Sequence, residues 1–206
     1  QVELARSRTA DIAPALPELL RRVQAAFGPR HRSAARVEAL LARADLQRGQ
    51  AVESEARLRA TVEWVRASLP NDVELLAELL RDRLRVLRRI ALVSAASREP
   101  SIVTMREVYD LAVERLAAQR EAAGPTALDT LRAELDLAKV AMDCGGKTEG
   151  LARADAILAG TERSLGECHS IRADARGVRR SCLRALGRAD EAADEAKRCV
   201  ECVRAS

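Results

Sequence analysis

The residues whose order comes nearest to a catalytic motif are Gly145-Gly146-Lys147-Thr148. With Ala141 placed before them, they fit a permissive phosphate-binding loop, in which backbone N–H groups cradle phosphates and the lysine reaches them. Such a loop needs a strand before it and a helix after it. The preceding residues have helical periodicity instead, so we expect a turn between two helices. Nucleotide hydrolysis by Lys147 and Thr148 stays a third-ranked alternative.

Cysteine and histidine residues are candidates for a metal site. Cys199 and Cys202 are spaced one helical turn apart, and with Cys182 and His169 they could supply four tetrahedral zinc ligands. A zinc knuckle usually holds its cysteine pair on a tight turn, and no second closely spaced pair follows. The chain has five cysteines at irregular spacing, which is not a disulfide framework. We expect reduced thiols that pack as small hydrophobic side chains, and we leave metal binding by Cys199 and Cys202 open.

Nothing in the sequence groups residues for nucleophilic or acid–base catalysis. His31 and His169 each stand three residues after a glycine of the repeat described below, which indicates a shared structural role at a helix start. A catalytic triad would need these side chains to converge with others far away in the chain. Scattered carboxylates are expected on solvated helix faces: Glu114, Glu134 and Asp136. We expect no enzymatic activity and no cofactor.

The elements that must position these residues follow a fixed spacing. Glycine or proline recurs every 21 residues in two groups: Gly124, Gly145, Gly166 and Gly187, and Gly28, Gly49 and Pro70. Between these positions the apolar residues recur at helical spacing. A period of two helices and 42 residues is typical of a solenoid, in which each helix hairpin buries its apolar face by stacking on its neighbours.

The repeat divides the chain into units. We predict one helical repeat domain over 1–206, with units at about 28–69, 70–123, 124–165 and 166–206 and a remnant of a preceding unit at 1–27. The unit at 70 is enlarged, and we expect its extra residues in two longer helices over 73–96 and 102–122. The first of these helices is apolar on more than one face, so it is either buried or a contact for a partner.

Composition supports an all-α fold. Hydrophobic residues make up 48% of the chain, yet Phe, Trp and Tyr occur once each. Alanine, leucine and valine must therefore build the interior, and such side chains suit closely packed helices.

The residues Leu186-Gly-Arg-Ala-Asp-Glu-Ala-Ala193 resemble the turn and second-helix start of tetratricopeptide (TPR) repeats. The period and the run Gly124-Pro-Thr-Ala-Leu-Asp-Thr-Leu-Arg-Ala133 resemble the longer repeats of kinesin light chains and their bacterial relatives. This resemblance implies a right-handed superhelix of antiparallel helix hairpins, here with one enlarged hairpin, whose first helices line a concave face that binds a peptide or protein. In bacteria similar repeats often follow a serine/threonine kinase domain or occur in regulators and sensors.

A basic pattern recurs on the same grid. Arg43, Arg85 and Lys139 each stand fifteen residues after a repeat start, and Arg36 and Arg132 stand eight after it. Positions eight and fifteen lie on one helix face, so stacking predicts a column of positive charge. The candidate partner-binding residues are Arg36, Arg43, Arg81, Arg85, Arg88, Arg132 and Lys139. Guanidinium groups pair with carboxylate or phosphate, which favours an acidic or phosphorylated ligand. The alternative is that Glu78, Asp82 and Glu134 neutralise this face.

Charge and hydropathy narrow the function classes. Thirty-five Lys and Arg against 31 Asp and Glu give a net charge of +4 with mixed signs, which does not indicate nucleic-acid binding. No apolar run predicts a membrane span or signal peptide, so we expect a cytoplasmic protein. The chain begins at Gln1 in helix-like sequence, which indicates a piece of something longer.

The sequence thus predicts a protein- or peptide-binding scaffold, a regulatory segment of a larger bacterial signalling protein such as one with a kinase domain before it. A small-molecule-sensing module of a transcription regulator is the main alternative. Residues 73–122 are the candidate for self-association or a domain contact.

Overall fold

The computed structural model describes residues 12–97 and 104–205, and all regular secondary structure in these ranges is helical. The all-α prediction is therefore confirmed. The chain forms two compact units, Gln1–Thr104 and Met105–Ser206. Every helix in the described ranges is too short or too polar to cross a lipid bilayer.

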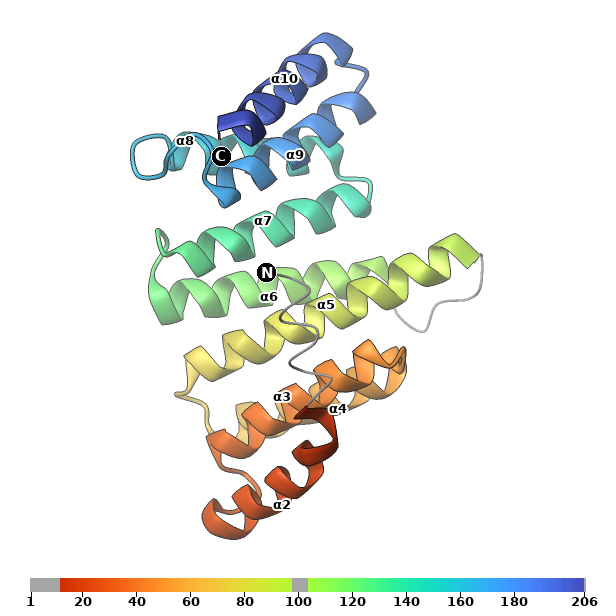
Figure 1. Cartoon of the computed structure of the whole chain (residues 1–206), viewed down its shortest axis with the longest axis vertical. Coiled ribbons are helices and arrows are strands. Elements are labelled where there is room, and N and C mark those ends of the chain that lie inside the picture. Colours follow the sequence, from red (N-terminus) through yellow and green to blue (C-terminus); the bar gives the residue numbers. More distant parts are fainter. Residues whose placement is uncertain (1–11, 98–103, 206) are drawn as a thin grey trace. The chain divides into compact units, whose positions relative to one another are not determined.

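The first unit begins with a short 3-10 helix, η1 (Ala13–Ala15), and continues through α2 (Leu16–Phe27), α3 (Arg32–Gln47), α4 (Ala51–Ser68) and α5 (Val73–Ser97). Each α-helix packs against the next, and α3 also contacts α5 (Figure 1). This alternation is what stacked hairpins require, because the first helix of one hairpin meets the first helix of the next. Leu16, Val37 and Leu41 form a buried cluster between α2 and α3.

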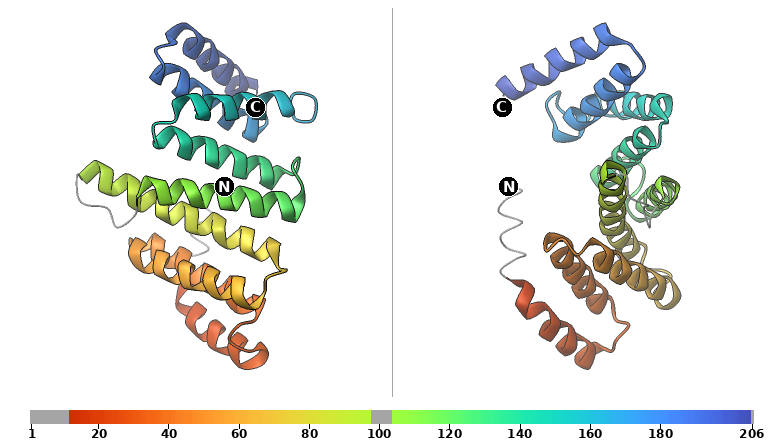
Figure 2. Two further views of the ribbon diagram at one scale, coloured as in Figure 1. Left: turned by 180° about the vertical axis from the view of Figure 1, so that it is seen from behind. Right: turned by 90° about the vertical axis from the view of Figure 1, so that its right-hand side faces the viewer.

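The second unit contains α6 (Met105–Ala123), α7 (Leu128–Asp143), α8 (Lys147–Gly160), α9 (Ser170–Ala185) and α10 (Ala189–Ala205). Consecutive helices pack together, and α7 also contacts α9 (Figure 2). The core of this unit contains Ala138 of α7, Ile157 of α8 and Leu183 of α9. The same hairpin pattern therefore builds both units.

Glycine ends helices where the spacing predicted turns. Five of the six spaced glycines have φ between 77° and 91°, a conformation that L side chains rarely adopt. Gly166 is the exception. The unit predicted over 124–165 would extend its second helix to the end of the unit, but α8 ends at Gly160 and a longer connection leads to α9. The hydroxyl of Thr161 donates to the carbonyl of Ile157 at 2.7 Å, which satisfies an acceptor in the last turn.

The two histidines share the structural role that their positions predicted. His31 and His169 are the N-caps of α3 and α9, and each Nδ1 accepts a hydrogen bond from the backbone N–H two residues later, at 3.2 and 3.3 Å. Ser33 lies in the first turn of α3. Asp72 caps α5, because its Oδ1 accepts from the N–H of Leu75 at 3.2 Å.

The prediction of reduced thiols is wrong for two of the five cysteines. Cys168, in the connection before α9, forms a disulfide with Cys202 of α10, and their Cα atoms are 5.1 Å apart. These two residues are 34 positions apart in the sequence, and the hairpin of α9 and α10 brings them together. The spacing of the cysteines in the sequence could not reveal this pairing. Cys144, Cys182 and Cys199 remain free, and Cys182 is buried in the core as a small hydrophobic side chain.

Candidate partner-binding face

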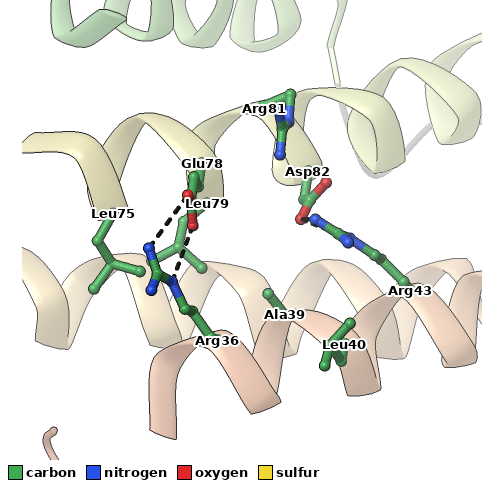
Figure 3. Close-up of a pocket in the computed structure, with 9 residues that line it drawn as sticks. All are labelled: Arg36, Ala39, Leu40, Arg43, Leu75, Glu78, Leu79, Arg81 and Asp82. Carbon is green, nitrogen blue, oxygen red and sulfur yellow. Dashed lines mark hydrogen bonds and ion pairs between the residues drawn. The ribbon is translucent and has the colours of Figure 1, made fainter. Parts of the chain in front are cut away.

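In the first unit, five of the predicted basic residues come from two neighbouring helices. Arg36 and Arg43 lie on α3, and Arg81, Arg85 and Arg88 lie on α5. Figure 3 shows three of them, Arg36, Arg43 and Arg81, around one hollow between these helices. Stacking of first helices therefore does bring basic side chains of successive repeats together.

Most of this positive charge is already neutralised. Arg36 Nε lies 3.3 Å from Glu78 Oε2, and Arg43 Nη2 lies 2.7 Å from Asp82 Oδ2. The carboxylate of Asp82 is buried and also lies 3.7 Å from Arg85 Nη1. The pairs of Arg36 and Arg43 join α3 to α5, so the neutralisation that the sequence offered as an alternative is real for Glu78 and Asp82. Such pairs also fix how one hairpin stacks on the next.

Arg81 differs from its neighbours. It makes no hydrogen bond or ion pair with any described residue, and its Nε atom is buried without a hydrogen-bond partner. The hollow that it lines has a volume of about 290 Å³. Its other walls are Ala39 and Leu40 of α3 and Leu75 and Leu79 of α5. The cavity therefore combines an apolar wall with one guanidinium that has no counterion in the described part of the chain.

In the second unit, the two remaining predicted residues lie on α7. Arg132 pairs with Asp129 one turn away at 2.8 Å, and Lys139 Nζ lies 3.7 Å from Asp174 of α9. The Lys139–Asp174 pair links first helices of successive hairpins, as Arg43–Asp82 does in the first unit. Glu134 does not neutralise this face, because its two oxygens pair with Arg120 at 2.8 Å and Arg153 at 2.6 Å.

Sequence reasoning missed a polar network across α6, α7 and α8. The hydroxyl of Tyr109 donates to Glu149 at 2.7 Å, and Arg153 donates to the same carboxylate at 2.9 Å. The hydrogen bond from Tyr109, followed by that from Arg153, lowers the pKa of Glu149, and the bond to Glu149 raises the pKa of Tyr109. Tyr109 is the only tyrosine in the chain. The single occurrence of tyrosine was the one signal in the sequence, and it did not identify Glu149 as the partner.

The other candidate motifs do not assemble into sites. Gly145 and Gly146 form the turn between α7 and α8, so a helix precedes the phosphate-loop motif, as predicted. His169 caps α9, Cys182 lies in the core and Cys202 is in the disulfide, so the four proposed zinc ligands have separate roles. Among the described residues there is no group of three or more His, Cys, Asp or Glu placed to hold a metal ion.

Solved structures of known proteins share this arrangement. A variant of a putative kinesin light chain of Podosopora anserina, with nearly identical TPR-like repeats, is 18% identical, with a TM-score of 0.75 over 97% of this chain and 91% of that one. A second structure described as that protein gives 17% identity and a TM-score of 0.74, covering 97% and 92% of the two chains. The fold is that of kinesin-light-chain-type TPR repeats.

BtubC (BKLC) from P. vanneervenii has the same TPR-type fold, with 14% identity and a TM-score of 0.73 over 97% of this chain and 74% of that one. No protein-family model and no curated protein sequence matches the chain. At these identities the likeness establishes the fold alone.

Proposed function

We propose that this chain binds a protein or peptide segment of acidic character on the face formed by α3 and α5, and that α7 supplies a similar face in the second unit. The observation that carries the proposal is the cavity beside Arg81, which offers an uncompensated positive charge next to apolar side chains. A partner segment with a negative charge would form an ion pair with Arg81. The TPR-type fold supports a binding role.

A pulldown from lysate of the source organism tests this function. The wild-type chain is compared with a variant in which Arg43, Arg85 and Lys139 are replaced by Glu, at low and at moderate salt. A partner held by the wild type and lost by the variant supports the proposal, and its binding should weaken as salt rises. A partner that binds both chains equally places the binding surface elsewhere.

The variant needs a structural control, because Arg43 pairs with the buried Asp82 and its replacement by Glu sets two carboxylates together. Circular dichroism of the variant should match that of the wild type. The single variant Lys139→Glu tests the second unit separately, because the Lys139–Asp174 pair has a long distance of 3.7 Å and Asp174 is exposed.

The wider setting is also proposed. We propose that the chain serves as the interaction segment of a larger bacterial signalling protein, one with a serine/threonine kinase domain, in the cytoplasm. The cytoplasm keeps most thiols reduced, whereas the structure contains the Cys168–Cys202 bond. Alkylation of thiols in intact cells, followed by mass spectrometry, measures the oxidised fraction. A fully oxidised pair would argue against a cytoplasmic location.

The end of α5 is a second candidate contact. Most large apolar residues of this helix are buried, whereas Leu92 and Val93 are 44% and 59% exposed. We propose that this end contributes to self-association. Light scattering of the wild type and of a Leu92→Gln, Val93→Gln variant tests it, and a monomeric wild type at high concentration would rule it out.

A binding pocket for a small molecule is the second candidate function. A volume of about 290 Å³ is just below the usual range for small-molecule pockets. A metabolite retained after purification and seen by native mass spectrometry would favour this function over peptide binding.

A further inference from the structure

The inference concerns the cavity between α3 and α5 and rests on the proposed binding function. Its polar lining consists of three cations and two anions: Arg36, Arg43 and Arg81, and Glu78 and Asp82. Arg36 lies close to Glu78 and Arg43 close to Asp82, as Figure 3 shows. One positive charge, that of Arg81, is left over.

The position of Arg81 makes that charge significant. Figure 3 shows its side chain between Glu78 and Asp82, directed toward the α3 side of the cavity. Its Nε–H is out of contact with solvent and has no acceptor among the described residues. A donor that has lost its water and gained no acceptor destabilises the free state of the site. An incoming acceptor pairs instead with the Nη groups of the same guanidinium, which are not buried in this way.

The charge of the site selects among acceptors. Among the groups that line the cavity, a single negative charge balances the three guanidinium groups against the two carboxylates, and the exposed Arg85 beside Asp82 lies outside this lining. A phosphate monoester carries almost two negative charges and would face Glu78 and Asp82 with an excess. Leu40 is the partly exposed leucine of the lining, whereas Leu75 and Leu79 are covered, and it adds a requirement for a short aliphatic stem. A carboxylate on a methylene chain meets both requirements.

We propose that Arg81 is the anchor for the side-chain carboxylate of one glutamate or aspartate in a bound protein segment. The methylene groups of that residue lie against Leu40, and the carboxylate accepts from the Nη–H groups of Arg81, the part of the guanidinium that is not buried. Arg36 and Arg43 keep their pairs with Glu78 and Asp82 and hold α3 and α5 at the spacing that forms the cavity. Selectivity for carboxylate over phosphate follows from those two acidic residues.

The test uses the complete chain labelled with ¹⁵N, in which arginine Nε–H groups give separate NMR signals. It is titrated with N-acetylglutamate N-methylamide at constant ionic strength. The neutral N-acetylglutamine N-methylamide and the more highly charged N-acetylphosphoserine N-methylamide are titrated in parallel. We expect saturable shifts of the Arg81 Nε–H signal with the glutamate derivative, and at least tenfold weaker binding of the other two.

Two variants complete the experiment. Arg81→Gln should weaken binding of the glutamate derivative by roughly tenfold or more, which is the effect of losing a charge-assisted hydrogen bond. Arg89→Gln is the matched control, because Arg89 is an exposed arginine of the same helix that does not line the cavity, and it should bind as the wild type does. The Nε–H spectra of both variants report whether the fold is intact.

Several results would overturn the inference. These are equal binding by Arg81→Gln and wild type, equal binding of the glutamine derivative, tighter binding of the phosphoserine derivative, and the absence of any saturable shift. The proposed function is tested separately in the pulldown. If a partner is lost with the Arg43, Arg85 and Lys139 variant but kept by Arg81→Gln, the binding face stands and the anchor assigned to Arg81 does not.

Discussion

Glu195 shows how a single buried carboxylate can hold several arginines in this protein. It is only 2% exposed on α10, and Arg179 Nη1 of α9 lies 2.7 Å from its Oε1. Arg198 and Arg176 approach it at 3.3 and 3.8 Å. Arg176 is itself buried, so its charge depends on carboxylates for compensation.

Replacing Glu195 with Gln should therefore destabilise the second unit by about 2 kcal/mol, because Arg176 and Arg179 lose a charge-assisted partner and keep only the carboxylates of Glu167 and Asp155 among the described residues. The urea midpoint measures this effect. Glu191→Gln is the control on the same helix, since Glu191 is exposed and pairs only with Arg188 one turn away among the described residues. Equal midpoints for the two variants would mean that Glu167 and Asp155 suffice for Arg176 and Arg179 without Glu195.

The ion pairs of Glu167 predict that the stability of the fold depends on pH. The hydrogen bond from Arg176, and then that from Arg172, lowers the pKa of Glu167 below its ordinary value of 4.5. The folded state thus binds this proton less readily than the unfolded state, so the contribution is complete above pH 4.5 and is lost as the pH falls through the lower folded pKa.

Glu167→Gln should accordingly reduce the loss of stability on acidification. The measurement compares urea midpoints at about pH 6 and about pH 3.5 for wild type and variant. The wild type should lose more stability than the variant between these values. An unchanged difference would show that Arg172 and Arg176 interact equally well with the neutral group.

Residue-level contacts were the least predictable part of the chain. The sequence named Glu78 and Asp82 as neutralising partners, and it placed His31 and His169 at helix starts, because both follow from a regular grid. It could not show that Arg81 lacks a partner in the cavity, since helical spacing gives the face of a residue but not the rotamers that decide which charges meet. Glu134 illustrates this limit, because it pairs with Arg120 and Arg153 and leaves Arg132 and Lys139 to other partners.

At the scale of elements, α8 approaches its neighbours through a glycine. A Cβ atom added to Gly150 would lie 3.1 Å from the carbonyl oxygen of Ala138 in α7 and 3.1 Å from the sulfur of Cys182 in α9. Gly150→Val should therefore destabilise the second unit by about 2 kcal/mol through overpacking. Gly160→Ala is the control in the same helix, because a Cβ there meets nothing within 4 Å. A thermal melt distinguishes the two, and equal melting temperatures would show that α8 shifts freely to make room.

The disulfide is the second prediction about elements. It closes a loop of 34 residues around α9 and most of α10, and a cross-link of that span stabilises by about 3 kcal/mol through the unfolded chain. Cys168→Ser should lower the urea midpoint under non-reducing conditions. Cys199→Ser, which alters a free thiol of α10, should not. If reduction of the wild type changes nothing, the bond does not form in solution.

Helix positions were largely predictable. The expected helices over 73–96 and 102–122 correspond to α5 and α6, with ends that differ by at most three residues. Residues 102 and 103 lie outside the described ranges. Glycine and proline recur at fixed intervals, and most of them end a helix for a steric reason that the sequence alone displays. The end of α8 was misplaced because Ile157, Leu158 and Leu165 continue an apolar pattern after the backbone has left the helix. The disulfide was missed because cysteine pairing depends on tertiary contacts.

For the whole molecule, the proposal of one repeat domain over residues 1–206 has a direct test. In a single solenoid each repeat is stabilised by its neighbours. The fragment 105–206 should then unfold at lower urea than the same residues do in the complete chain, as followed by NMR signals of α7 and α9. Equal midpoints would make the two compact units independent domains.

The bond between Cys168 and Cys202 also determines how this protein responds to tension. A chain pulled at its two ends passes the force directly through the sulfur atoms, so the residues between them carry none. An extended chain spans about 3.5 Å per residue, so the 34-residue segment closed by the disulfide would add about 120 Å to the length of the stretched chain if the bond were absent. Under load α9 bears no tension at all, while the preceding helices stretch, until a reductant releases the withheld length in one step.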